Sequence, residues 1–194
     1  MKKSFIFLAD GFETVEAMTP LDVLRRAGIP VQTVSLTSNH AVESVQGVKI
    51  CADLIFDPTH FKEVDWLILP GGMPGAENLY KFAPLTGLLR DHASRGGHIA
   101  AICASPGVVL GQLGLLKGYK ATCYPGFESM LAGAEYVDAP VVADRNMVLG
   151  NGPANAQTWS LAIVKATLGE RVADRIAGDM LYFHPCDDTN NFFG

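Results

Sequence analysis

The sequence predicts an α/β fold in which a mostly parallel sheet carries helices on both faces. Two observations support this prediction. Short, continuously apolar runs typical of buried strands alternate with helical patterns, and no repeat, linker or low-complexity tract divides the chain. Apolar strands separated by helices form parallel sheets that are covered on both sides. The length of 194 residues suits one domain, so we expect a single α/β domain over residues 1–194.

In the first half of the chain, apolar β-type runs flank one helical pattern that ends at Gly28. KSFIFLA and PVQTVSL predict strands, VKICADL predicts an extended piece after a polar, hairpin-like excursion, and DWLILPGG predicts a strand that enters a glycine turn. The expected elements are a strand at 3–9, a helix at 14–27, a strand at 30–36, an extended piece at 48–54, and a strand with its turn at 65–72.

The second half continues the alternation. Gly96 and Gly97 close a helical pattern before the strand HIAAIC, and Pro106 marks the start of the next helix. KATCY predicts another strand, and VVADRNMVLGN predicts a β-ribbon. The expected elements are a helix at 85–95, a strand at 98–103, a helix directly after it, a strand at 120–124, a ribbon at 141–151 and a helix at 154–168.

Composition excludes several classes of function. A formal net charge of −5 without any basic run argues against nucleic acid as a partner. The uncharged segment 99–116 approaches the length of a membrane span, but Pro106 and glycines interrupt it, and a buried strand followed by a helix explains it better. The four cysteines show no C-x-x-C pair, and the N-terminus does not resemble a signal peptide. We therefore expect a cytoplasmic protein with free thiols.

Three expected strands end in residues that can carry chemistry. The first is followed by Glu13 and Glu16 at a helix start, the fourth by paired glycines in LPGGMPG, and the fifth by Cys103. The carboxyl ends of parallel strands meet at one edge of the sheet, where ligands bind. Each feature also has a structural interpretation. A buried cysteine packs as an inert, small apolar residue, a glycine pair forms a turn, and an acidic residue suits the first turn of a helix.

Four motifs in order give the chain a resemblance to a known family. They are E-x-x-x-P-x-D-V-L-R-R-A-G at 16–28, LPGG at 69–72, AAICA at 100–104 and a GP pair at 152–153. With them the chain resembles the ThiJ/PfpI (class I glutamine amidotransferase-like) superfamily, in the branch of the parkinsonism-associated protein deglycase and its bacterial relatives. The resemblance implies a flavodoxin-like sandwich formed by one such domain.

The resemblance also implies a site. Cys103 would be the nucleophile on a sharp strand-to-helix elbow, and Glu16 the carboxyl beside it. The backbone N–H groups of Gly72 and Ala104 would form an oxyanion hole. The remaining pocket candidates are Gly71, Tyr124, Cys123 and Asn155. No metal and no organic cofactor is implied.

For this site the sequence predicts a thiolate on Cys103 and a proton on Glu16 at pH 7. A helix start with N–H donors favours a thiolate, and a dry pocket raises the pKa of a carboxyl. Two positions depart from the branch, because Tyr124 stands where a histidine is common and Gln46 where a basic residue is common. No histidine is well placed beside Cys103, so a Cys-His-Asp protease is disfavoured.

The leading functional hypothesis is a cofactor-independent, cysteine-dependent enzyme of glyoxalase or deglycase type. It would act on small aldehydes or glycated substrates and protect against carbonyl or oxidative stress. The alternatives are a non-enzymatic redox sensor or chaperone with an oxidisable cysteine, and an amidase, protease-like hydrolase or thiamine-pathway enzyme.

Two further expectations concern assembly and the C-terminus. Family members pair as dimers, so we expect a homodimer through a patch near the first helix and the VKICA strand, close to Cys51. The segment HPCDD at 184–188 contains groups able to bind a metal, but polar residues at a terminus more often form a solvated tail.

Overall fold

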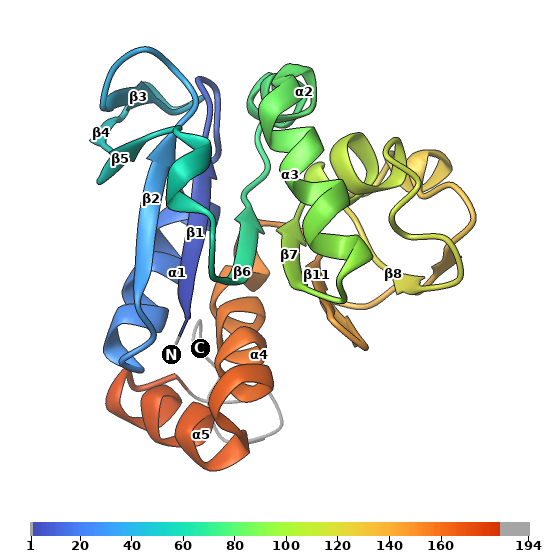
Figure 1. Ribbon diagram of the computed structural model, residues 1–194. Coiled ribbons are helices and arrows are strands. Elements are labelled where there is room, and N and C mark those ends of the chain that lie inside the picture. Colours follow the sequence, from blue (N-terminus) through green and yellow to red (C-terminus); the bar gives the residue numbers. More distant parts are fainter. Residues whose placement is uncertain (1, 183–194) are drawn as a thin grey trace.

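The computed structural model of the chain describes residues 2–182. Its central sheet has seven strands in the order β10-β11-β7-β6-β1-β2-β5 (Figure 1). All neighbours in this sheet are parallel except β10 and β11. The strands are β1 (Lys3–Leu8), β2 (Val31–Ser35), β5 (Leu54–Ile55), β6 (Val64–Leu69), β7 (His98–Ile102), β10 (Val141–Asp144) and β11 (Met147–Gly150).

Without the two-residue edge strand β5, the parallel part of the sheet has the flavodoxin-like order, because β2, β1, β6, β7 and β11 are then its second, first, third, fourth and fifth strands along the chain. This confirms the predicted α/β fold with a mostly parallel sheet. That residues 1–194 form a single domain stays a prediction. In such sheets, ligands bind where the strand order reverses. Here the strand order reverses between β1 and β6, and β7 is the next strand beyond β6.

Helices cover both faces of the sheet. The main helices are α1 (Thr14–Arg26), α2 (Gly75–Lys81), α3 (Ala83–Ser94), α4 (Ala156–Leu168) and α5 (Glu170–Asp179). Shorter helical turns are η1 (Pro58–His60), η3 (Glu128–Met130) and η4 (Pro153–Asn155), and η2 (Pro106–Gly111) is a π-helix. None of the helices between residues 2 and 182 is both long enough and apolar enough to span a bilayer.

Strand residues alternate between two apolar cores, one on each face. On β1, Ile6 joins the core that includes α1, α4 and α5, whereas Phe7 joins the core that includes α2 and α3. The same alternation divides Ala100 from Ala101 on β7. Because successive side chains of a strand point to opposite faces, continuous apolar runs are what a sheet covered on both sides requires.

The expected helices at 14–27, 85–95 and 154–168 agree with α1, α3 and α4 to within about three residues, as is usual for helix ends. Two helices, α2 and α5, were not expected. The expected strand at 120–124 is reduced to β8 (Lys120–Ala121), which pairs with β9 (Glu135–Tyr136) outside the central sheet. The strand stops because the chain turns toward β7, where Tyr124 N–H donates to Cys103 O at 2.8 Å.

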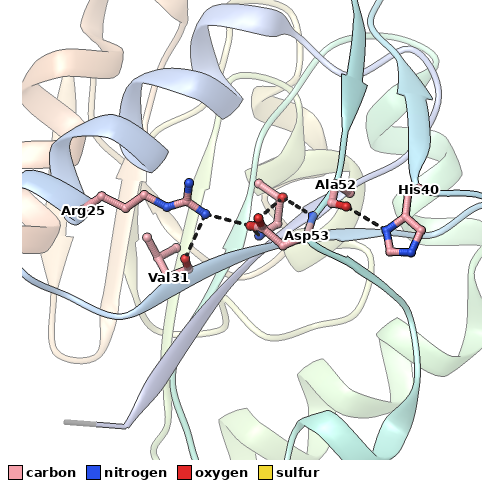
Figure 2. Close-up of polar contacts among 6 residues, drawn as sticks. Arg25, Val31, His40, Ala52 and Asp53 are labelled. Atoms are coloured by element: carbon pink, nitrogen blue, oxygen red, sulfur yellow. Dashed lines mark hydrogen bonds and ion pairs between the residues drawn. The ribbon is translucent and has the colours of Figure 1, made fainter.

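The expected extended piece at 48–54 is divided. Its first part is β4 (Lys49–Cys51), which forms an antiparallel hairpin with β3 (Ala41–Glu43), and β5 follows. Figure 1 shows this hairpin beyond the carboxyl ends of β1 and β2. The base of the hairpin is anchored, because Asp53 Oδ2 accepts hydrogen bonds from Arg25 Nη2 and Thr33 N–H, both at 2.8 Å. His40 Nδ1 also lies 2.8 Å from Ala52 O (Figure 2).

Candidate active site around Cys103

Cys103 follows β7 directly, in a backbone conformation that residues other than glycine rarely adopt. Its φ is +64°, in the left-handed region, where a side chain costs about 1–3 kcal/mol. Two hydrogen bonds hold this elbow: Cys103 N–H donates to Gly150 O at 3.0 Å, and Cys103 O accepts from Tyr124 N–H. The residue is 9% exposed. The thiol is therefore fixed, nearly buried, at the carboxyl edge of the sheet.

Two glycines after β6 allow the backbone to approach this thiol. A Cβ atom on Gly71 would lie 2.6 Å from Cys103 Cβ and 2.8 Å from Glu16 Oε2. Gly72 has a φ of +87°, and a Cβ atom there would lie 2.5 Å from Glu13 N. Contacts this short mean that a side chain at either position would force neighbouring atoms to move. The glycine pair is thus required for close packing as well as for a turn.

The segment after the elbow is tied to this glycine loop by Ser105, which the sequence analysis did not single out. Its hydroxyl is fully buried and donates to Pro70 O at 2.6 Å. The bond joins the start of the π-helix to the residue just before the glycine pair. A serine inside an otherwise apolar run was the available signal, because a buried hydroxyl needs a partner.

Glu16 enters the site from the first turn of α1 and is completely buried. Its Oε2 accepts a hydrogen bond from Gly71 N–H at 2.8 Å. Among the described residues, Oε1 has no hydrogen-bond partner of standard geometry. Burial raises the pKa of Glu16 to about 7, the Gly71 N–H lowers it, and repulsion from Glu13 raises it again. Glu16 can therefore both hold and release a proton near neutral pH.

The sulfur of Cys103 experiences opposing influences. Burial raises the pKa of the thiol to about 12, and an ionised Glu16 also raises it. The backbone N–H groups of Gly72 and Ala104 lower it by hydrogen bonding. Burial therefore opposes a charge on either group, while the N–H donors favour one on the sulfur. The thiolate on Cys103 and the proton on Glu16 stay a prediction.

The structure brings five of the predicted site residues together: Cys103, Glu16, Gly71, Gly72 and Ala104. Glu16 comes from the first turn of α1, the helix that follows β1, and the other four follow β6 and β7, so the segments after these strands do meet at one edge. The N–H groups of Gly72 and Ala104 reach the sulfur of Cys103, and their role as an oxyanion hole stays a prediction.

The other predicted pocket residues have different surroundings. Tyr124 is 45% exposed and is bonded to the elbow through its backbone. Cys123 is buried in the apolar core on the α3 face of the sheet, whereas Cys103 belongs to the opposite core. Asn155 Nδ2 donates to Asn151 Oδ1 at 2.8 Å. No hydrogen bond joins Asn155 to Cys103 within residues 2–182.

No group of three or more His, Cys, Asp or Glu side chains is arranged to hold a metal ion in the part of the chain that the structure describes. The HPCDD segment, which offered potential ligands, lies outside the described residues.

Comparison with known proteins gives consistent matches. The DJ-1/PfpI family matches residues 2–166. An Arabidopsis thaliana protein, DJ-1 homolog B, is 36% identical over 181 residues, which are 93% of this chain and 41% of that protein. The chain thus spans less than half of this plant relative. Deglycase PH1704 of Pyrococcus horikoshii is 33% identical over 84% of this chain and 98% of its own length. The solved structure of oxidized Toxoplasma gondii DJ-1 superposes with a TM-score of 0.91 at 35% identity, covering 95% of this chain and all of that one.

Proposed function

The chain belongs to the DJ-1/PfpI family, and from this premise we propose that it is a cysteine-dependent, cofactor-independent enzyme that acts on small reactive carbonyls. The observation that supports this most is the pairing of the Cys103 thiol with a buried Glu16 whose pKa is about 7. A general base with a pKa near the working pH is well matched to proton transfer. A relative of similar length is named a deglycase, which fits the same chemistry.

In the first step, the sulfur of Cys103 attacks the aldehyde carbon of a substrate such as methylglyoxal. A C–S bond forms while the carboxylate of Glu16 takes the thiol proton, so no free thiolate has to exist beforehand. Negative charge develops on the aldehyde oxygen, and the N–H groups of Gly72 and Ala104 stabilise it. Transfer of the proton from Glu16 to this oxygen gives a neutral hemithioacetal.

In the second step, Glu16 removes the hydrogen from the former aldehyde carbon and delivers a proton to the neighbouring carbonyl carbon. In the enediol between these two transfers, the ketone oxygen has gained a proton, and the hydroxyl on the sulfur-bearing carbon then loses one, so the product is a thioester of a 2-hydroxy acid on Cys103. Water then attacks the thioester, the C–S bond breaks, and the thiol regains its proton. The aldehyde carbon is oxidised and its neighbour reduced, so the net reaction adds one water and needs no external oxidant. Early glycation adducts would be attacked by the same two groups.

The proposal is tested by measuring lactate formation from methylglyoxal without glutathione. Wild type should form lactate, whereas Cys103→Ser should lose the nucleophile and Glu16→Gln the proton carrier, each lowering the rate at least about 100-fold. The matched control is Cys51→Ser, which removes an exposed thiol on β4 and should keep full activity. If wild type forms lactate no faster than Cys103→Ser, the proposal is wrong.

Oxidation of Cys103 is a second candidate function, because the Toxoplasma gondii relative was solved in an oxidized form. A peroxide would convert the thiol into a sulfenic acid, releasing water or an alcohol. Intact mass after treatment with hydrogen peroxide should then show added oxygen in wild type and in Cys51→Ser, but not in Cys103→Ser. Oxidation without aldehyde turnover would favour a redox role over the enzyme.

We also propose a cytoplasmic homodimer. Three exposed valines, Val15 on α1 and Val45 and Val48 in the β3–β4 turn, lie on neighbouring segments. The backbone joins these segments, because Val45 N–H donates to Phe12 O at 2.9 Å. An apolar patch of this kind suits an isologous contact between two copies.

A further inference from the structure

The first turn of α1, which carries Glu16, is capped by two residues far apart in the sequence. Glu13 precedes the helix, and its Oε2 accepts from Glu16 N–H at 2.7 Å. Gln46 lies in the turn of the β3–β4 hairpin, and its Oε1 accepts from Thr14 N–H at 3.2 Å and from Thr14 Oγ1 at 2.8 Å. Gln46 Nε2 donates to Glu13 Oε1 at 3.0 Å. Both carboxylate oxygens of Glu13 are therefore occupied, one by the helix and one by the hairpin.

Glu13 is also joined to the glycine loop through its backbone. Its N–H donates to Gly71 O at 3.0 Å, while Gly71 N–H donates to Glu16 Oε2 at 2.8 Å. Gly71 is thus hydrogen-bonded through its carbonyl oxygen to Glu13 and through its N–H to the Glu16 carboxyl, which faces Cys103. A displacement of Glu13 would move Glu16 and the Gly71 backbone together.

The hairpin that carries Gln46 is itself held at both ends. Its base is fixed by the contacts of His40, Ala52 and Asp53 (Figure 2). Nearer its turn, Gly11 N–H donates to Glu43 O at 2.8 Å, and Val45 N–H donates to Phe12 O. Gln46 therefore projects from a fixed strand pair rather than from a free loop.

From this geometry we propose that Glu13 is a positioning residue for Glu16, and that Gln46 holds Glu13 in place from the hairpin. The role in turnover rests on the proposed function, but the coupling between Glu13 and Glu16 does not. Within the described part of the chain, two ionisable groups face Glu16: Glu13 from the start of α1 and Cys103 from the end of β7. The charge of Glu13 repels the charge of Glu16 and so helps to keep its proton.

The experiment is a carbon-13 NMR titration of the Glu16 carboxyl, assigned by its loss in Glu16→Gln. In Glu13→Gln the cap oxygen remains but the charge is gone, so the Glu16 midpoint should fall by about half a pH unit. In Gln46→Ala the Glu13 carboxylate is released toward solvent, and the midpoint should fall by less. The matched control is Glu63→Gln, which neutralises an exposed glutamate before β6 and should leave the midpoint unchanged.

A double-substitution cycle separates this role from a structural one. Adding Gln46→Ala to Glu13→Gln should cause no further shift, because no charge remains to be positioned. Equal shifts from Gln46→Ala in both backgrounds, or a midpoint that stays within about 0.1 unit of wild type in Glu13→Gln, would overturn the proposal. The acid limb of methylglyoxal turnover should move by the same amount as the NMR midpoint. If wild type shows no turnover, the proposed function fails, while the NMR midpoints still decide the coupling.

Discussion

Replacing Glu16 by glutamine should change how the stability of the protein depends on pH. The pKa of Glu16 is about 7 in the folded protein and 4.5 for an ordinary glutamate, chiefly because the folded protein buries the carboxyl. A difference of about 2.5 units corresponds to about 3 kcal/mol, since each unit is worth about 1.4 kcal/mol. The folded state binds this proton more tightly than the unfolded state. The stabilisation is therefore present in full below pH 4.5 and is lost as the pH rises through 7.

The assay is urea unfolding between about pH 4 and pH 8, followed by the fluorescence of Trp66 and Trp159, both of which are buried. The free energy of unfolding of wild type should fall by about 3 kcal/mol more than that of Glu16→Gln across this range. The other ionisable groups are common to both proteins and cancel in the difference. Cys103 contributes little, because its thiol stays protonated in both states up to about pH 8.

The amide of Glu16→Gln also changes the free energy of unfolding by an amount that does not depend on pH. That amount does not affect the test, because only the change of this free energy with pH is compared. Glu63→Gln serves as the control. It replaces an exposed glutamate, so the free energy of unfolding of this variant should change with pH as that of wild type does. Parallel stability curves for wild type and Glu16→Gln, within about 1 kcal/mol across the range, would refute the reasoning. Such curves would mean that the pKa of Glu16 in the folded protein is that of an ordinary glutamate.

Three further predictions concern the elbow, the glycine loop and the dimer. The rate of Cys103 alkylation by iodoacetamide should rise with pH from about 7 to 9, because burial raises the pKa of the thiol; a plateau already reached below pH 7 would show a thiolate instead. Gly71→Ala should abolish aldehyde turnover and lower stability by about 1–3 kcal/mol, because its methyl group would lie 2.6 Å from Cys103 Cβ. The exposed helical position Gly87, where a Cβ atom meets nothing within 4 Å, is the control, and Gly87→Ala should raise the melting temperature. Light scattering should give about twice 20.8 kDa for wild type and 20.8 kDa for Val45→Asp; a monomeric wild type at micromolar concentration would contradict the dimer.

The sequence was sufficient to predict the strands that build the site. β1, β6 and β7 are largely continuous apolar runs, and such runs are typical of strands in a sheet that is buried on both faces. Their carboxyl ends meet because they are parallel neighbours, which brings Glu16, Gly71 and Cys103 together without any knowledge of side-chain positions. The close approach itself could not be predicted, because it depends on the spacing between two backbone segments, which is so small that a Cβ atom on Gly71 would lie 2.6 Å from Cys103 Cβ.

The missed and shortened elements have local causes. The helix α2 has seven residues and no side-chain cap, so its pattern is too short to be distinguished from the glycine-rich loop before it. The helix α5 has a clearer signal, since Ala173 and Ile176 are spaced to face one side and are buried against α4. The strand predicted at 120–124 ends at Ala121, because the backbone of Tyr124 is hydrogen-bonded to Cys103 at the elbow and not to a neighbouring strand.

The order in which the two catalytic candidates ionise depends on a balance that the motifs do not specify. A cysteine at a helix start with two N–H donors predicts a thiolate, and both donors are present, from Gly72 and Ala104. Burial opposes them, because Cys103 is only 9% exposed and lies beside a carboxyl that is completely buried. A pair of this kind holds one negative charge near neutral pH, because the charge of either group disfavours ionisation of the other. In the proposed mechanism the thiol proton passes to Glu16 as the new bond forms, so the position of Glu16, which we propose that Glu13 and Gln46 hold, sets the reactivity of the thiol.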